Sequence, residues 1–287
     1  MLTDYHLHLR PDDADAAPER YFTEANVERY REVADERAIE ELGVSEHIYR
    51  FHQALELWRH PFWERYAHDD LDDYCNFVRE QTDLRLGIEM DFVPGAEDRT
   101  ASLLDARDFD YVVGSVHFVS DGAVDMELFT AWDPRDPRRS PEAVWTRYFE
   151  TVAASAASGL FDIIAHPDLV KYFGPSHPER IPARDLRFFY EPAVEAFAEA
   201  GVAVEVSTAG WRKPAAELYP APAFLEMCVE AGVPVALSSD AHHAEDVGAD
   251  YERALELLSD LGVGELAVFD HRTRALEPLG ARAGGEG

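Results

Sequence analysis

The chain has few cysteines and no long hydrophobic run. Its 287 residues include only two cysteines, Cys75 and Cys228, too few for a disulfide framework in a chain of this length. Both lie in stretches with helical apolar periodicity, so we expect reduced core residues. No stretch reaches the roughly 20 apolar residues that a transmembrane helix needs, and the first residues lack the features of a secretory signal. These absences favour a cytoplasmic protein with no membrane partner.

Basic residues are also scarce. The chain has 26 Lys and Arg against 57 Asp and Glu, a formal net charge of -31. Nonspecific nucleic-acid binding depends on cationic side chains that neutralise phosphates, so we expect no nucleic-acid partner. The same charge would repel an anionic substrate, unless bound divalent cations reverse the field locally.

The chain contains no Gly/Ser linker and no shift of composition at its middle. A hydrophobic content of 46% is enough for one large domain with a substantial core. We therefore predict a single domain over residues 1–280 and a disordered tail over 281–287. Nothing in the composition indicates the oligomeric state.

Amphipathic helices alternate with short apolar runs along the whole chain. Five of the runs begin at or just after a glycine that we expect to end the preceding helix in a left-handed conformation: Gly43, Gly159, Gly201, Gly232 and Gly262. Seven runs are predicted strands: 2–7, 43–46, 84–91, 111–117, 161–165, 202–207 and 234–239. An eighth apolar run, ELAVFD, ends the series. This alternation predicts a parallel sheet, and seven or eight such units favour a closed (β/α) barrel.

Most of these strands end in side chains that can bind metals. His6 and His8 alternate on one strand and so share a face, and Glu89 ends the LRLGI run. Asp91 shares the face of Glu89, and we interpret it as a supporting or surface acid. The other candidate ligands at strand ends are His47, His117, His166, Asp240 and His242. Each histidine alone could be an ordinary core residue, but their shared position at strand ends favours a metal centre.

Eight such groups exceed the three or four protein ligands of one zinc ion, so they predict two or three divalent ions with shared ligands. The chain has no G-x-S-x-G elbow and no Gly-rich phosphate loop. A metal-bridging hydroxide is therefore the expected nucleophile. The long segments 48–70 and 119–140 follow ligand-bearing strands, and we expect both to lie over the mouth of the barrel.

Six motifs in this order, DYHLH, SEH, GIE, GSVHF, HPD and SDAHH, resemble those of the PHP (polymerase and histidinol phosphatase) family. The resemblance covers nearly the whole chain, and the TAGWRKP segment is similar to the monofunctional phosphatases of that family. It implies a distorted (β/α)7 TIM-like barrel with a trinuclear centre of Zn, Fe or Mn.

The resemblance also implies how the ligands are shared. One ion would take His6, His8, Glu89 and Asp240, a second would share Glu89 with His117 and His166, and a third would take His47 and His242. The chain departs from the family where relatives carry a histidine in a CPHG-like segment, because RPDDADAAP has none. Asp13 or Asp15 could supply an oxygen ligand instead.

The activity that the resemblance implies is hydrolysis of L-histidinol phosphate, a phosphate ester, in histidine biosynthesis. Arg212 would bind the phosphate, and Lys171 would either assist it or be an ordinary surface lysine. Asp240 or His242 would handle the proton, and Asp91 or Glu46 would bind the substrate amine. The alternatives are a phosphoesterase for another small phosphomonoester or phosphodiester, and a non-catalytic metal-binding module.

Overall fold

The structure, a computed structural model, describes residues 1–12, 17–133 and 135–279. The predicted tail at 281–287 and the two candidate ligands Asp13 and Asp15 lie outside these ranges. Within them, no helix is long and apolar enough to cross a membrane.

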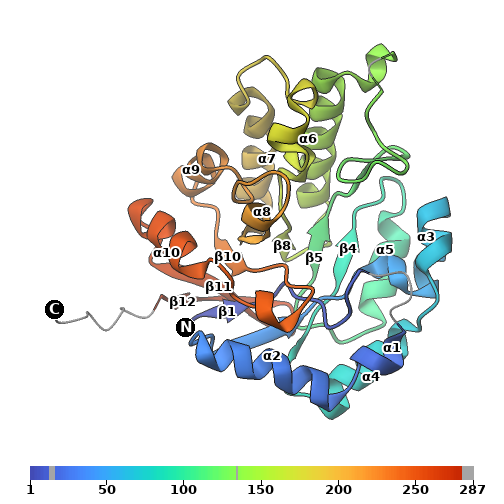
Figure 1. Ribbon diagram of the computed structural model, residues 1–287, viewed down its shortest axis with the longest axis vertical. Helices are drawn as coiled ribbons and strands as arrows, with labels where there is room; N and C mark the ends of the chain where they lie inside the picture. The colour runs from blue at the N-terminus through green and yellow to red at the C-terminus, as the bar shows by residue number, and fades with distance from the viewer. Residues whose placement is uncertain (13–16, 134, 280–287) are drawn as a thin grey trace.

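The centre of the molecule is built from parallel strands, as the alternating pattern predicts. One sheet has the order β1-β2-β3 and a second the order β10-β9-β8-β5-β4, with every neighbouring pair parallel. The strands are β1 Thr3–Asp4, β2 Glu41–Val44, β3 Arg85–Leu86, β4 Glu89–Asp91, β5 Val113–Ser115, β8 Ile163–Ile164, β9 Ala203–Ser207 and β10 Val235–Ser238. They run through the middle of the view in Figure 1, with helices around them.

The predicted strand 84–91 is divided into two. The first part, β3, pairs with β2, and the second, β4, pairs with β5, so the chain changes partner at Gly87 and Ile88. Isolated parallel bridges link the two sheets, one between His47 and Glu89 and one between Leu7 and Ala241. A single continuous barrel ladder is therefore not present over the described strands, although both sheets direct their carboxyl ends to the same region.

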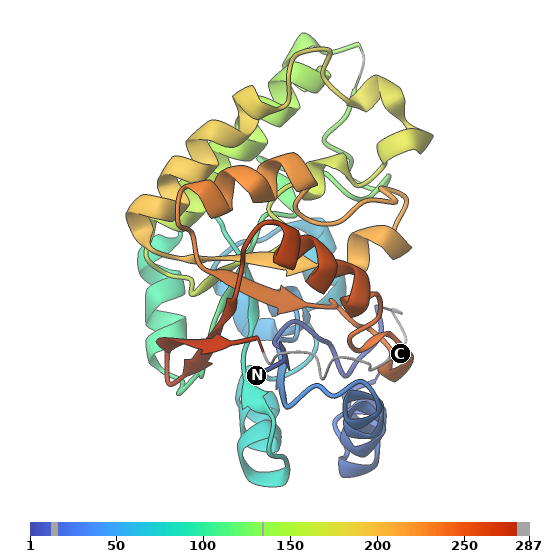
Figure 2. The same ribbon diagram turned by 90° about the vertical axis from the view of Figure 1, so that its left-hand side faces the viewer.

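The helices cover the outside of the strands. The longer ones are α2 Glu24–Glu36, α4 Leu71–Gln81, α5 Glu97–Asp105, α6 Pro141–Ala157, α7 Arg187–Ala200, α9 Pro222–Glu230 and α10 Tyr251–Asp260, and the short ones are α1 Pro18–Tyr21, α3 Pro61–Tyr66 and α8 Ala209–Arg212. Helices α6, α7 and α9 lie side by side at one end of the molecule in both views (Figures 1 and 2). Single 3-10 turns, η1 Ile48–Arg50, η2 His52–Glu56, η3 Pro137–Arg139, η4 Leu169–Lys171, η5 Gly174–Ser176, η6 Pro178–Arg180 and η7 Ala244–Asp246, occupy the connections.

Four of the five predicted glycine caps have the expected left-handed backbone, and Gly43 does not. Gly159, Gly201, Gly232 and Gly262 have φ between 67° and 77°, whereas Gly43 lies inside β2, because α2 already ends at Glu36. A Cβ at Gly43 would come within 2.4 Å of the Tyr111 hydroxyl oxygen. The glycine at this position therefore makes room for a buried ring rather than ending a helix.

The last apolar run does not add a parallel strand. It forms β11, Glu265–Asp270, which pairs antiparallel with β12, Thr273–Pro278. A second small hairpin, β6 Phe118–Val119 with β7 Gly122–Ala123, begins the long segment after His117. Both hairpins were missing from the predicted order, which contained only strands of βα units.

Candidate metal centre

The structure brings the eight predicted ligands together at the carboxyl ends of the strands. Glu89, at the start of β4, lies at the centre of the group. Its Oε2 is 3.4 Å from His6 Nε2 and 3.7 Å from His8 Nε2, and it also contacts His47 Nδ1. Its Oε1 is 3.1 Å from His166 Nε2 and 3.4 Å from His117 Nε2. Both carboxylate oxygens thus face histidines, as a bridging ligand requires.

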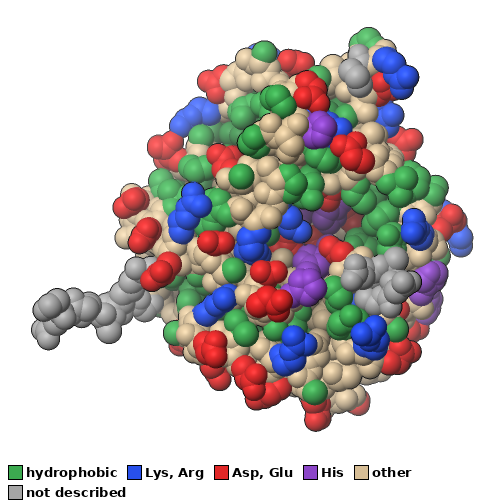
Figure 3. Space-filling view, in the orientation of Figure 1, with side chains coloured by type: hydrophobic (Ala, Val, Ile, Leu, Met, Phe, Trp, Pro, Cys, Tyr) green, Lys and Arg blue, Asp and Glu red, His purple; other side chains and the backbone are tan. Residues whose placement is uncertain are grey.

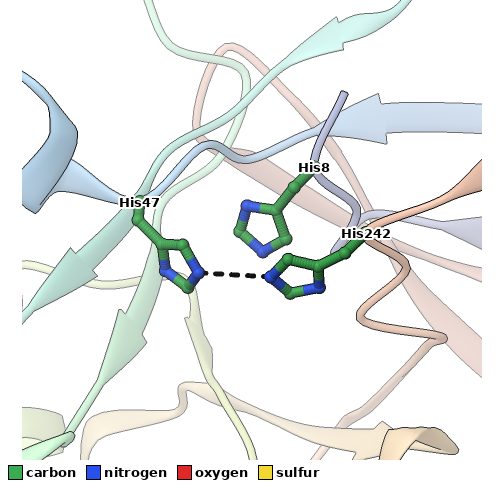
Figure 4. A group of neighbouring side chains, drawn as sticks. All are labelled: His8, His47 and His242. Atoms are coloured by element: carbon green, nitrogen blue, oxygen red, sulfur yellow. Dashed lines mark hydrogen bonds between the residues drawn. The ribbon is translucent and has the colours of Figure 1, made fainter. Parts of the chain in front are cut away.

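Asp240 and His242 complete the ring from the end of β10. Asp240 Oδ1 lies 3.5 Å from His8 Nε2 and 3.8 Å from His6 Nε2. Asp240 has a φ of 49°, a left-handed backbone conformation that is uncommon for residues other than glycine but that Asp adopts more readily than most. Figure 4 shows His8, His47 and His242 directed toward one another, with Nε2 of His47 and His242 3.4 Å apart.

The chemistry of the ring fits a metal centre. His6 Nε2 and both ring nitrogens of His8 are buried and have no hydrogen-bond partner within the described residues. Buried polar atoms are costly when they lack a partner. Four overlapping groups of three have ligand atoms within 4.8 Å of one another: His6–His8–Asp240, His6–Glu89–His166, His47–Glu89–His117 and His8–His47–His242. Neutral imidazole and carboxylate ligands in such groups suit Zn²⁺, Mn²⁺ and Fe²⁺.

Two buried carboxylates orient the histidines from behind. Glu205, in the middle of β9, has Oε1 2.6 Å from His6 Nδ1 and accepts a hydrogen bond of 2.6 Å from Ser238 Oγ. Asp91 Oδ1 is 2.8 Å from His117 Nδ1. Such contacts fix the ring orientation and leave Nε2 for a metal. Asp91 thus has the supporting position that we expected, and it is buried rather than on the surface.

Sequence reasoning missed Glu205, although a signal was present. It is a charged residue inside the apolar run VAVEVS, and a carboxylate in a buried strand needs a partner. We interpreted the run as an ordinary core strand, and the partner, His6, is 199 positions away.

Asp12, in the same segment as the candidates Asp13 and Asp15, contacts the third group of predicted ligands. Its carboxylate lies 3.1 Å from His242 Nε2 and 3.6 Å from His47 Nε2, and it accepts a hydrogen bond of 2.9 Å from Arg50. The third group of ligands therefore has a candidate oxygen donor at Asp12, while Asp13 and Asp15 lie outside the described residues.

Five of the eight ligands, His47, His117, His166, Asp240 and His242, line a cavity of about 290 Å³. Figure 3 shows histidines at the bottom of this hollow. The two long segments line it as predicted, with Tyr49, Phe62 and Tyr66 from the first and Asp125 and Met126 from the second. Lys213 also reaches the cavity.

The predicted phosphate ligand, Arg212, does not line this cavity, but it lines an adjoining one together with Asp12, Lys213, Asp240 and His242. It donates a hydrogen bond of 2.6 Å to the backbone oxygen of Ser239 and lies 3.6 Å from Asp246. Its guanidinium therefore supports the segment that carries Asp240. The next residue, Lys213, faces both this side and the main cavity. Burial lowers the pKa of Lys213, but the charges of Asp240 and Asp12 outweigh it and raise the pKa overall, so the residue stays cationic.

Lys171 is neither a phosphate ligand nor an ordinary surface lysine in the structure. It is buried, and its Nζ lies 2.9 Å from Asp168, 2.8 Å from Glu217 and 2.6 Å from the backbone oxygen of Leu218. These contacts direct it away from the ligand ring and toward the segment before α9.

Neither acid that we suggested for the substrate amine reaches the cavity. Glu46 is fully buried and accepts hydrogen bonds from the backbone nitrogens of Leu9 and Arg10, and Asp91 is engaged by His117. Their partners fix the ligand-bearing segments instead.

Glu89 shifts the pKa values of the histidines around it. Burial lowers the pKa of His117, but the charges of Asp91 and Glu89 outweigh it and raise the pKa to about 10. Burial also lowers the pKa of His47, but the charges of Glu89 and Asp12 outweigh it and raise that pKa to about 8. Burial and the charges of His47 and His242 hold the pKa of His8 well below its usual value. Without metal the ring is therefore a mixture of charged and neutral imidazoles.

A comparison of the sequence with known families identifies the group to which it belongs. The model of the PHP domain matches residues 21–209. The chain belongs to the PHP family. Among curated proteins it is 35% identical to a probable histidinol-phosphatase of Deinococcus radiodurans, over 80% of this chain and 86% of that protein. It is 28% identical to the histidinol-phosphatase of Bacillus subtilis, over 67% of this chain and 75% of that protein.

Solved PHP structures have a similar fold. Histidinol phosphate phosphatase of Lactococcus lactis, complexed with zinc, L-histidinol and phosphate, superposes with a TM-score of 0.70 at 19% identity, over 96% of this chain and 98% of that one. A putative histidinol phosphatase of Listeria monocytogenes gives a TM-score of 0.67 at 18% identity, over 88% and 99%.

Proposed function

We propose that the protein hydrolyses L-histidinol phosphate to L-histidinol and phosphate with two or three divalent ions of Zn, Fe or Mn. The observation that carries this proposal is the convergence of eight ligands, some with unpaired buried atoms, of which five line a small cavity. The named relatives support the same reaction, since four of the sequence matches besides the Deinococcus protein carry the name histidinol-phosphatase or probable histidinol-phosphatase.

The residues fit up to three ions. Glu89 would be shared, with His6, His8 and Asp240 on one side and His117 and His166 on the other. His47, His242 and Asp12 would hold the third. Bound divalent ions lower the pKa of coordinated water and stabilise negative charge on a phosphoryl group. Asp12 makes the third set richer in oxygen, which favours a harder ion there.

The remaining steps depend on side chains that line the cavity. Among the described residues, Lys213 is the one Lys or Arg that lines the main cavity. It would therefore bind a phosphate oxygen. Asp240 and His242 both reach the cavity, and His242 Nδ1 is 3.6 Å from Asp240 Oδ1. This pair could accept a proton from the attacking water or supply one to the leaving alkoxide.

The closure of the strands into a barrel is a further part of the proposal. We infer that the seven strand positions form a distorted (β/α)7 barrel. Single contacts would close it at the two places where the two sheets meet. The Leu7–Ala241 bridge and the hydrogen bond of 3.0 Å from Ser239 N to Asp4 Oδ1 support closure between β1 and β10. The His47–Glu89 bridge supports continuity between β2 and β4.

Metal removal tests the reaction. Phosphate release from L-histidinol phosphate should be lost after dialysis against a chelator and should return when Zn²⁺, Mn²⁺ or Fe²⁺ is added. Glu89→Gln should lower the rate by about 100-fold or more, because it weakens a ligand shared by both ions. Strong turnover after complete metal removal would contradict the mechanism. Equal or faster turnover of unrelated phosphomonoesters would instead favour a different substrate.

A further inference from the structure

Asp125 is an acid in the cavity that neither the metal ring nor the phosphate requires. It follows β7 in the long segment after His117 and lines the cavity. The residue before it, Val124, is held at both of its backbone polar atoms, because Val124 N donates to His117 O at 3.0 Å and Trp132 Nε1 donates to Val124 O at 3.3 Å. The segment is therefore attached to the strand end that carries a metal ligand, which places Asp125 at the edge of the ring.

The carboxylate of Asp125 has no ion-pair partner within the described residues. Its Oδ1 is buried and makes no hydrogen bond to any residue in that part of the chain. The other two carboxylates of the cavity do have cationic neighbours or histidines, since Asp12 contacts Arg50 and His242, and Asp240 contacts His8. A buried carboxylate oxygen without a partner is unfavourable unless a bound group donates a hydrogen bond to it.

The proposed substrate offers such a group. L-Histidinol phosphate carries an ammonium on the carbon next to its phosphoester CH₂, so the ammonium must lie close to the phosphate. With phosphate held between the metal ring and Lys213, the ammonium needs an acid at the edge of the ring. Asp125 lines the same cavity as His117 and His166, and within the described residues its carboxylate is not engaged by an ion pair, as those of Asp12 and Asp240 are.

We propose that Asp125 binds the ammonium of the substrate and thereby selects amino-alcohol phosphates over simple phosphomonoesters. This inference rests on the proposed function, and it replaces Asp91 and Glu46, whose oxygens are already occupied. The interaction is a charge-assisted hydrogen bond between a carboxylate and an ammonium. This hydrogen bond determines which phosphate esters are preferred as substrates. The hydrolysis of the phosphoester bond itself does not require it.

A paired-substrate experiment tests the assignment. The substrates are L-histidinol phosphate and its deamino analogue, 3-(imidazol-4-yl)propyl phosphate, with metal-loaded wild-type protein and Asp125→Asn. The variant should lower kcat/KM for L-histidinol phosphate by about 10- to 100-fold, because a hydrogen bond between charged groups is lost. It should leave kcat/KM for the analogue within about three-fold. The wild-type preference for the natural substrate should therefore disappear.

Asp121→Asn is the matched control, because Asp121 lies in the same segment and is exposed. This variant should leave kcat/KM unchanged for both substrates. Unchanged turnover of both substrates by Asp125→Asn would overturn the inference. Equal loss for both, with metal lost in elemental analysis, would also overturn it by assigning Asp125 to the metal centre. Wild-type protein that releases phosphate from neither compound would reject the proposed function itself, together with the inference.

Discussion

At the scale of single residues, the role of each histidine is set by what lies behind it. His6 and His117 are held by Glu205 and Asp91, which leave Nε2 of each ring facing Glu89. The sequence predicted the side chains that face inward, because they end apolar strands. It could not predict Glu205 as the partner of His6, since that pairing depends on β9 and the segment after β1, which are distant in the chain, lying close together in the fold.

Glu205→Gln should weaken metal binding without unfolding the protein. Loss of the carboxylate behind a metal-binding histidine typically costs about 10- to 100-fold in metal affinity. We expect that loss in a competition titration with a chelating dye, and recovery of phosphatase activity at high metal concentration. Glu199→Gln, at an exposed position of α7, should behave as the wild type. Wild-type affinity in Glu205→Gln would show that the contact with His6 has no effect on the ligands.

Metal binding should release protons. At pH 7 the raised pKa values of His6, His47 and His117 keep these rings protonated in the metal-free protein, and a ligating imidazole must be neutral. Calorimetric titrations of metal into metal-free protein, in buffers of different ionisation enthalpy, should therefore show net proton release and an affinity that falls as the pH falls. An observed enthalpy that does not depend on the buffer would contradict this.

The same shifts determine how the metal-free protein responds to pH. A histidine whose pKa is raised in the folded state contributes stability below its unfolded value, which is 6.5 here, and loses that contribution as the pH rises through its folded value. The metal-free protein should therefore lose stability between pH 6.5 and the values of about 8 and 10 for His47 and His117. The metal-loaded protein should instead lose stability toward acid pH.

At the scale of elements, the sequence predicted the parallel strands and failed at positions where local signals were misleading. The β11–β12 hairpin has no Asn-Gly or Asp-Gly turn, which is the usual signal. Its turn residues, His271 and Arg272, have φ of 45° and 60°. Contacts with Asp108 and Asp162 hold their side chains, so tertiary interactions stabilise a turn that local preference disfavours.

Gly43→Ala should destabilise the protein, because its Cβ would collide with the Tyr111 ring. Overpacking a core typically costs about 1–3 kcal/mol, and we expect that loss in the free energy of unfolding from urea denaturation. Gly264→Ala is the control, because no atom lies within 4 Å of the added Cβ and its φ is not positive; it should be close to neutral. Equal stability of both variants would contradict the packing role of Gly43.

At the scale of the whole molecule, the dominant property is the net charge of -31. Self-repulsion between like charges destabilises a compact state, and salt screens it over a Debye length that shortens as ionic strength rises. The acidic metal ligands contribute to this excess of negative charge. Bound metal ions therefore neutralise part of the negative charge at the centre of the molecule.

The melting temperature of the metal-loaded protein should rise with ionic strength between about 10 mM and about 500 mM salt, because screening weakens the repulsion. Differential scanning calorimetry with sodium chloride measures this rise. Tetramethylammonium chloride should give the same rise, since screening does not depend on the cation. A melting temperature that falls or stays constant with salt would contradict this account.

The sequence by itself determined the alternating α/β organisation, the family and the side chains that end the strands, because these follow from short-range periodicity and from motifs that are local in the chain. Only the tertiary structure decided which of the neighbouring candidates reaches the cavity. Arg212 and Lys213 are adjacent, yet Lys213 faces the main cavity while Arg212 binds the Ser239 backbone. Asp12 likewise gains its position from contacts with Arg50 and His242, which are far away in the chain and which no local pattern encodes.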